Sequence, residues 1–143
     1  MCIRDRYSKE ELSAIRRVCD ENNLFLFADG ARLGYGLEAP GNDVTLADLA
    51  ACCDVFYIGG TKIGALLGEA VVIVNPKLQK DFRCFMKQRG AMLAKGRILG
   101  LQFLALFEDG LYFKLSKHAD DMAQIIRQAC KDCLLYTSDA ADE

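Results

Sequence analysis

Two short motifs in this sequence place charged side chains and glycines directly after apolar runs. The first, Ala28-Asp29-Gly30-Ala31-Arg32, follows the run LFLF, and the second, Gly59-Gly60-Thr61-Lys62, follows the run VFYI. Short apolar runs of this kind predict buried strands. Ligands of open α/β sheets bind at the carboxyl ends of the strands, and the interval between the motifs has room for one crossover helix. We therefore expect both motifs to reach the same edge of one sheet.

A carboxylate and a lysine in one partly buried cleft suit a pyridoxal-phosphate site. The amine of Lys62 can form a Schiff base with the cofactor aldehyde, and the substrate amino group can later displace it. The carboxylate of Asp29 can keep the pyridine nitrogen protonated, so that the ring withdraws electrons from a bond at the substrate Cα. Arg32 offers a planar guanidinium suited to the substrate carboxylate.

Each motif also has a simpler interpretation. An Asp-Gly pair after a strand is usually a turn, and a lysine beside glycines is usually a solvated loop residue. The second motif is not a Walker phosphate loop, because threonine precedes lysine and the first glycine of that pattern is missing. The residues alone therefore leave a non-catalytic α/β scaffold open beside the cofactor site.

The surrounding sequence predicts the helices and strands that would position these motifs. Ser8 with Glu11 three residues later is a capping-box pattern, so a helix begins there and ends at Asn22 and Asn23. The glycine-rich stretch 33–42 predicts a loop. The other predicted elements are strands over 24–28, 54–60 and 70–75, a short helix within 44–53 capped by Thr45 or Asp43, and helices over 76–88, 97–107 and 111–131.

Apolar strands separated by helices predict an α/β fold with a mostly parallel sheet flanked by helices. The link between the second and third strands is short and rich in glycine, so a hairpin with an antiparallel third strand is the alternative. The strand over 24–28 is expected to be covered on both faces. Two apolar helical stripes are expected in the core, one of Ile98, Leu101 and Leu104 and one of Met122, Ile125 and Ile126.

The composition predicts a soluble globular protein. The chain has 143 residues, of which 52% are hydrophobic and 27% charged, with a net charge of -2. This balance gives no indication of a nucleic-acid partner, and no apolar run reaches the roughly 18 residues of a membrane span. The seven cysteines and the single His118 form no tetrahedral zinc pattern, so no metal site is expected. Reduced thiols and a chain start unlike a signal peptide favour a cytoplasmic location.

The two ends of the sequence differ in kind from the rest. Residues 1–6, MCIRDR, can be back-translated into a transposase end sequence of tagmentation libraries. Residues 133–143, CLLYTSDAADE, fit the reverse complement of the same element running into its adaptor. Two matches in reading frame are hard to attribute to chance, so both ends are expected to be adaptor-derived artefacts of a metagenomic assembly. Residues 7–132 are then the biological part of the chain.

The two motifs and their surroundings resemble the threonine aldolase and aromatic amino acid β-eliminating lyase family of fold-type-I pyridoxal-phosphate enzymes. The segment 29–32 is similar to the DGAR signature of threonine aldolases, and Thr61-Lys62 is similar to the Ser/Thr-Lys after their next strand. GALLGEAVVIVNP and KQRGAMLAKGRILGLQF are similar to later segments of the family. The resemblance covers nearly all of residues 7–132. It implies that they form a partial pyridoxal-phosphate-binding large domain, aspartate-aminotransferase-like in fold, with the start of the C-terminal helical region.

The resemblance implies a role for each of five residues. Lys62 is the catalytic lysine that forms the Schiff base with pyridoxal 5'-phosphate. Asp29 pairs with the pyridine nitrogen, and Ala31 packs against the cofactor ring. Arg32 binds the substrate carboxylate, and Thr61 contacts the cofactor.

The sequence departs from the family in one stretch. Many threonine aldolases carry a GGGMRQ-like segment where this chain has RGAMLAKGR. Lys95 or Arg97 could supply that basic contact to a neighbouring subunit's phosphate, or could simply lie at a subunit contact. Residues 7–132 show no counterpart of the family's phosphate cradle, ring-stacking residue or second carboxylate-binding arginine, and His118 is expected at the surface.

The activity implied by the resemblance is that of a pyridoxal-phosphate-dependent aldehyde-lyase. It would cleave the Cα–Cβ bond of a β-hydroxy-α-amino acid such as threonine to glycine and an aldehyde. Another β-eliminating lyase or an aminotransferase is the alternative, because Lys62 and Asp29 serve the cofactor and not the choice of bond. The expected partners are a small amino-acid substrate and further copies of the chain, in a homo-oligomer that is a dimer or tetramer. The chain alone is expected to be an inactive internal fragment that aggregates.

Overall fold

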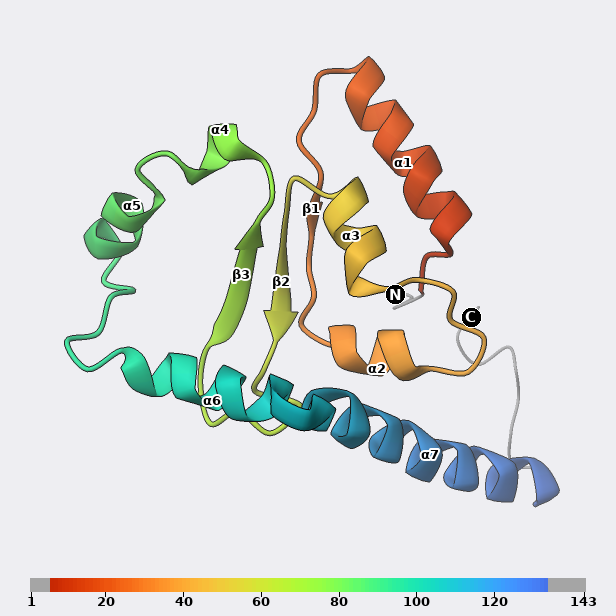
Figure 1. Cartoon of the computed structure of the whole chain (residues 1–143). Coiled ribbons are helices and arrows are strands. Elements are labelled where there is room, and N and C mark those ends of the chain that lie inside the picture. Colours follow the sequence, from red (N-terminus) through yellow and green to blue (C-terminus); the bar gives the residue numbers. More distant parts are fainter. Residues whose placement is uncertain (1–5, 134–143) are drawn as a thin grey trace.

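The computed structural model describes residues 6–133, in which helices surround one small sheet (Figure 1). The elements are α1 (Lys9–Glu21), β1 (Phe27–Ala28), α2 (Leu33–Glu38), α3 (Leu46–Cys52), β2 (Val55–Gly59), β3 (Glu69–Ile73), α4 (Pro76–Gln79), α5 (Phe82–Gln88), α6 (Arg97–Phe107), the short 3-10 helix η1 (Glu108–Gly110) and α7 (Leu111–Asp132). The predicted adaptor-derived ends, 1–6 and 133–143, lie outside the described residues except for Arg6 and Cys133. Within the described part of the chain, no helix has the length and apolar character needed to cross a membrane.

The sheet has the strand order β1-β2-β3 and is mixed. β1 pairs with β2 in parallel, with Phe27 opposite Val55. β2 pairs with β3 in antiparallel fashion, from Val55 opposite Ile73 to Gly59 opposite Glu69. The α/β class is therefore as predicted, and the third strand takes the hairpin alternative. The carboxyl ends of β1 and β2 lie at the same edge of the sheet, where α6 and α7 cross below the strands (Figure 1).

One face of the sheet carries the core. Phe56 and Ile58 of β2 are buried on this face together with Leu12 of α1 and Leu49 of α3. On the opposite face Phe27 is 58% exposed. The expectation that residues 24–28 form a strand covered on both faces is therefore wrong, since only Phe27 and Ala28 pair and no described element covers their outer face.

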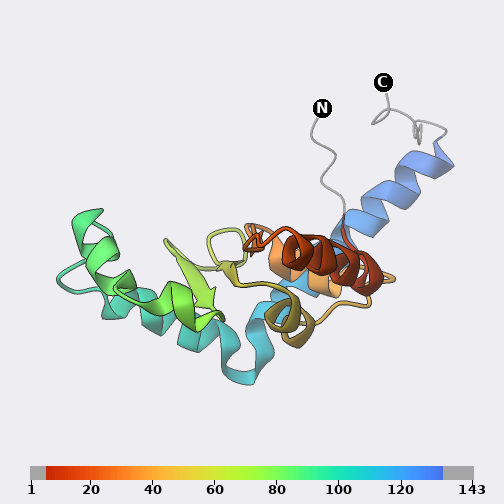
Figure 2. The ribbon, with the colours of Figure 1, turned by 90° about the horizontal axis from the view of Figure 1, so that it is seen from above.

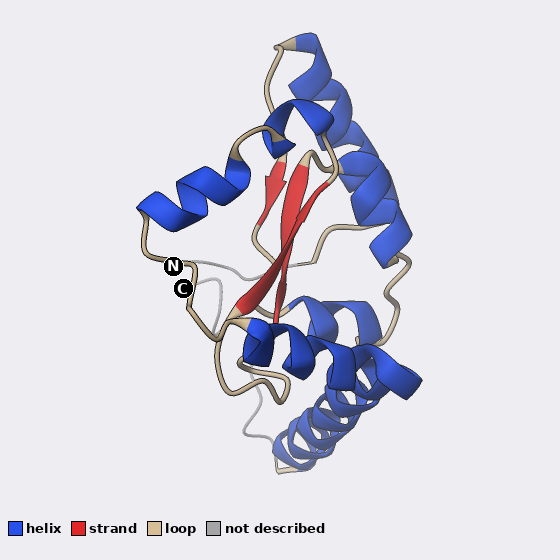
Figure 3. Cartoon of the chain, turned by 60° about the vertical axis from the view of Figure 1, so that its left-hand side comes forward, coloured by secondary structure: helices blue, strands red, loops and turns tan. Residues whose placement is uncertain are grey.

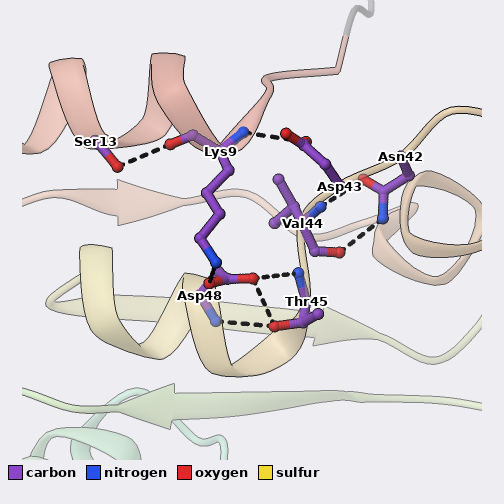
Figure 4. A network of polar contacts seen from close by, with 7 residues as sticks. All are labelled: Lys9, Ser13, Asn42, Asp43, Val44, Thr45 and Asp48. Atoms are coloured by element: carbon purple, nitrogen blue, oxygen red, sulfur yellow. Dashed lines mark hydrogen bonds and ion pairs between the residues drawn. The ribbon is translucent and has the colours of Figure 1, made fainter.

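A polar network joins the start of α1 to the start of α3 (Figure 4). Thr45 caps α3, because its hydroxyl accepts from the backbone N–H of Asp48 and the Asp48 carboxylate accepts from the backbone N–H of Thr45. Lys9 forms an ion pair with Asp48, and its backbone N–H donates to Asp43 at 3.1 Å. Of the two predicted caps, Thr45 is therefore the one used, and Asp43 instead fixes α1 beside α3.

The stretch 33–42, predicted to be a loop, begins with the helix α2. Gly34 is buried in this helix, and a Cβ added to it would lie 2.3 Å from Oγ of Ser116 in α7. α2 packs directly on α7. Glycine at this position therefore permits close contact between two helices. In the sequence, a glycine required for such packing cannot be told from a glycine of a loop.

The predicted helix over 76–88 is split in two. Asn75 caps α4 by accepting from the backbone N–H of Lys77, as expected for a helix that begins at Pro76. Asp81 then adopts a left-handed conformation with φ 57°, which ends the first helix and precedes α5. The break between α6 and α7 falls at Asp109 and Gly110 as predicted, and both have positive φ. Figures 2 and 3 show the resulting arrangement, with α6 and α7 running across one end of the strands.

The two predicted apolar stripes of α6 and α7 are not in the core. Their residues are 43% to 65% exposed: Ile98, Leu101, Leu104, Met122, Ile125 and Ile126. The two helices instead bury Leu106, Tyr112 and Ser116, which face the sheet edge and α2. His118 is exposed, as expected. The periodicity correctly identified apolar faces, but within residues 6–133 no other element lies against them.

Candidate active site

The two motifs meet through their backbones at the carboxyl edge of β1 and β2. The N–H of Gly59 donates to the carbonyl oxygen of Gly30 at 2.9 Å. A Cβ on Gly30 would lie 1.7 Å from the carbonyl oxygen of Tyr57, and one on Gly59 would lie 2.5 Å from that of Ala31. No side chain larger than hydrogen fits at either position without moving backbone. The glycines therefore allow the turns that carry Asp29 and Lys62 to touch, as the sequence predicted.

Asp29 is exposed and hydrogen-bonded through one carboxylate oxygen. Its Oδ1 accepts from the hydroxyl of Tyr57 and from the backbone N–H of Ala31. The hydrogen bond from Tyr57 is the main reason why the pKa of Asp29 is lowered, and the one from Ala31 comes next. The positive charges of Lys62 and Arg32 lower this pKa further. The structure therefore brings both predicted cations within electrostatic reach of the predicted carboxylate.

Lys62 lies in the exposed turn between β2 and β3. Its carbonyl oxygen accepts from the hydroxyl of Tyr35, which joins the turn to α2. No described residue forms a hydrogen bond or an ion pair with its Nζ. The backbone is thus anchored while the amine remains available for chemistry.

Glu69 holds the beginning of the same turn. Its carboxylate accepts from the backbone N–H of Gly60 at 2.6 Å and from Oγ1 of Thr61 at 3.2 Å. Gln102 of α6 holds the far side of the turn, because its Oε1 accepts from the N–H of Leu66 at 2.6 Å. The hydroxyl proton of Thr61 is therefore committed to Glu69, and a cofactor contact of Thr61 would use the oxygen as an acceptor.

Tyr112 of α7 connects the two motifs from below. Its side chain is completely buried, and its hydroxyl donates to the carbonyl oxygen of Gly59 at 3.0 Å. The same hydroxyl accepts from the N–H of Gly34 at 3.1 Å, two residues after Arg32. Burial raises the pKa of Tyr112 to about 12, so the hydroxyl keeps its proton. One side chain thereby fixes the end of β2 and the start of α2 relative to each other.

A cavity of about 840 Å³ opens beside the first motif. Its lining includes Asp29, Ala31 and Arg32, and continues over apolar side chains of α1 and the sheet. Thr61 and Lys62 do not line it. The described residues therefore form one side of an open site, in which the lysine turn lies next to the cavity and not inside it.

Four residues of the site were not singled out in the sequence: Tyr35, Tyr57, Glu69 and Tyr112. Tyr57 had a usable signal, because strand alternation places it on the face opposite Phe56 and Ile58. Glu69 also had one, since it directly follows the glycine-rich turn. The two others are joined to the motifs only by contacts across the fold, which sequence spacing does not reveal.

The groups brought together here fit pyridoxal phosphate. Asp29 is held as a carboxylate, and its Oδ2 has no hydrogen-bond donor among the described residues, so this oxygen can accept from a pyridine N–H. Lys62 offers an amine that none of the described residues pairs with, and Arg32 offers an exposed guanidinium. The structure is thus that of an α/β protein with a candidate cofactor site at the carboxyl edge of its parallel strands.

The chain belongs to the beta-eliminating lyase family, whose model matches residues 5–142. It is 36% identical over 126 residues to a low specificity L-threonine aldolase of a Pseudomonas species. It is 32% identical to the low specificity L-threonine aldolase of Pseudomonas aeruginosa, and each match covers 88% of this chain. In fold it is similar to Leishmania major threonine aldolase, with a TM-score of 0.87 and 48% identity over 89% of this chain. The chain spans 36% of the length of the two curated relatives and 37% of the Leishmania chain.

Proposed function

We propose that the protein carrying this chain is a pyridoxal-phosphate-dependent aldehyde-lyase of the low-specificity threonine aldolase type. It cleaves the Cα–Cβ bond of β-hydroxy-α-amino acids to give glycine and an aldehyde. The observation that carries the proposal is the backbone contact between Gly30 and Gly59, which brings Asp29 and Lys62 to one edge of the sheet. The names of the relatives support the choice of reaction. We further propose a cytoplasmic homo-oligomer, a dimer or tetramer, with residues 7–132 as part of its cofactor-binding domain.

Five residues of the two motifs have a role in this proposal. Asp29 accepts a hydrogen bond from the pyridine N–H through Oδ2, because Oδ1 is already used. Lys62 would hold the cofactor through Nζ, the amine that an aldehyde requires for a covalent link. Arg32 orients the substrate through its carboxylate. Ala31, two residues after Asp29, would pack a short side chain against the ring, and Thr61 would accept a hydrogen bond from the cofactor. When bound, pyridoxal phosphate supplies a ring that accepts the electrons of the broken bond.

The covalent role of Lys62 is tested by titrating the full-length protein with pyridoxal phosphate. We expect the wild type to develop the visible absorption band of a lysine-bound cofactor, and to carry the label on Lys62 after borohydride reduction and peptide mass analysis. Lys62→Ala should show neither. Lys80→Ala is the matched control, since Lys80 is an exposed lysine between α4 and α5, and it should bind as the wild type does. A wild type without the band would refute the cofactor and every role assigned to it.

The choice of bond is tested with threonine as substrate. Retro-aldol cleavage gives glycine and acetaldehyde in equal amounts. Elimination across Cα and Cβ gives a 2-oxo acid and ammonia instead. Glycine as the main product supports the aldolase, whereas a 2-oxo acid as the main product would favour the other lyases or aminotransferases that share this cofactor apparatus.

A further inference from the structure

Tyr57 is the side chain on which the geometry of Asp29 depends. We infer that Tyr57 is a positioning residue, whose hydroxyl orients the carboxylate of Asp29 so that Oδ2 faces the pyridine nitrogen of the cofactor. The inference rests on the proposed function, because it assigns the purpose of a contact within that site. None of the roles proposed above involves Tyr57. Its position in the sequence, five residues before Lys62, does not indicate a positioning role either.

The tyrosine lies on the strand in the middle of the described sheet. β2 is the central strand and pairs with both neighbours, and Tyr57 lies opposite Val71 of β3. Its ring lies 6.1 Å from that of Phe27 in β1, at an interplanar angle of 37°. Its carbonyl oxygen lies against Gly30, which follows Asp29 directly. Backbone and ring are thus both fixed before the hydroxyl reaches the carboxylate, which is the arrangement that positions a functional group accurately.

The two oxygens of Asp29 are treated differently. Oδ1 accepts from two donors, Tyr57 and the N–H of Ala31, while Oδ2 accepts from no described residue. The Ala31 bond is local and fixes the turn. The Tyr57 bond comes from another strand and fixes the carboxylate relative to β2, and therefore relative to Lys62 at the end of that strand.

The hydrogen bond also sets the conditions under which Asp29 stays ionised. The groups that act on the pair are Lys62 in the turn after β2, Arg32 before α2 and Glu69 at the start of β3. The two cations favour the carboxylate, and the hydrogen bond to Asp29 raises the pKa of the Tyr57 hydroxyl, with smaller contributions from burial and from the charges of Asp29 and Glu69. Tyr57 therefore remains a proton donor at neutral pH, and it opposes protonation of Asp29 in acid.

The test is a titration of full-length protein with pyridoxal phosphate across the acid range, for the wild type and Tyr57→Phe. The variant keeps the ring and its contact with Phe27 and removes only the donor. Its affinity should fall about three- to tenfold at neutral pH, the effect expected of one lost hydrogen bond. The acid limb of the binding curve should also move to higher pH, because Asp29 is then protonated more easily. Ser13→Ala is the control, since it removes a hydroxyl that donates to the carbonyl oxygen of Lys9 within α1 and does not line the cavity, and it should match the wild type.

A second background separates positioning from general damage to the fold. In Asp29→Asn the side chain cannot ionise, so adding Tyr57→Phe should leave the acid limb where the single Asp29→Asn variant has it. If Tyr57→Phe shifts the acid limb equally in both backgrounds, or in neither, the inference is overturned. If the wild type itself fails to bind pyridoxal phosphate, the proposed function fails first, and this inference with it. A Tyr57→Phe variant with normal circular dichroism and unchanged binding would overturn the inference alone.

Discussion

Two aspartates with lowered pKa values show how the same side chain serves different purposes in this chain. Asp54, before β2, uses both oxygens: Oδ2 accepts from Arg16 and from the N–H of Leu26, each at 2.7 Å, and Oδ1 accepts from Asn75 at 2.6 Å. It thereby joins α1, β1 and the end of β3 at the amino edge of β2. Asp29, at the opposite edge, leaves one oxygen without a described donor. The saturated carboxylate is structural, and the half-saturated one is available for a ligand.

At the residue scale we predict that Asp54→Asn destabilises the full-length protein by about 2 kcal/mol at neutral pH, because charged hydrogen bonds in a partly buried position are lost. The pKa of Asp54 is lowered to about 2, mainly by the hydrogen bond from Asn75 and next by the one from the backbone N–H of Leu26. A lowered folded-state pKa contributes stability above the ordinary pKa of aspartate, and this contribution is lost as the pH falls toward 2. Urea unfolding should therefore show a difference between wild type and variant that shrinks toward acid.

The control for that experiment is Asp20→Asn. Asp20 also pairs with Arg16, at 2.7 Å, but its side chain is 66% exposed. Its removal should cost no more than about 0.5 kcal/mol, as is usual for exposed pairs within a helix. Two results would contradict the view that the ionised carboxylate of Asp54 joins α1, β1 and the end of β3. One is an equal loss of unfolding free energy in the two variants, and the other is a loss for Asp54→Asn that is the same at every pH.

At the scale of elements, α2 packs closely on α7 because Gly34 has no side chain, and this contact places the first motif beside α7. We predict that Gly34→Ala destabilises the protein by about 1–3 kcal/mol, because the added methyl would meet Ser116 at 2.3 Å, Ile63 at 2.5 Å and Tyr112 at 2.8 Å. Thermal unfolding would measure the loss. Gly36→Ala in the same helix meets nothing within 4 Å and is the control, and it should be neutral or stabilising by up to about 1 kcal/mol. A destabilisation shared by both variants would indicate a general effect on α2.

The sequence predicted those elements whose start or end is determined by residues close by in the chain. The helix after Ser8 was predicted because its capping box lies within four residues, and the helix after Thr45 was predicted with Thr45 or Asp43 as its cap, both of which are local signals. α2 was missed because the reason for Gly34 lies in α7, far along the chain. The split at Asp81 was missed because a left-handed aspartate has no distinctive neighbour pattern.

The candidate site divides in the same way. Asp29, Arg32 and Lys62 were identified because each is a charged residue at the end of an apolar run. Tyr57 and Tyr112 were not, because the sequence indicates at most the face on which a tyrosine lies, as strand alternation does for Tyr57, and not the partner of its hydroxyl. Their partners are separated from them by 28 to 78 residues, so only the fold pairs them.

At the scale of the whole molecule, apolar surface remains open on α6, α7 and the outer face of the sheet. We predict that the 143-residue chain purified alone self-associates in size-exclusion chromatography and yields no glycine from threonine with added pyridoxal phosphate. Replacing Ile98, Leu101 and Leu104 of α6 with glutamate should reduce the association, because this apolar stripe would then be charged. Val18→Glu in α1 adds a charge elsewhere and should reduce it less. Monomeric elution of the unmodified chain, or turnover by it, would contradict this view.

The buried hydroxyl of Tyr112 has a consequence for the order in which the protein is made. The two motifs leave the ribosome before the side chain that fixes Gly34 and Gly59 relative to each other, which follows these glycines by 78 and 53 residues. A nascent chain that ends before Tyr112 contains Asp29 and Lys62 without the contact that sets their separation. We therefore expect the proposed cofactor site to be completed only after α7 has emerged and packed against both turns.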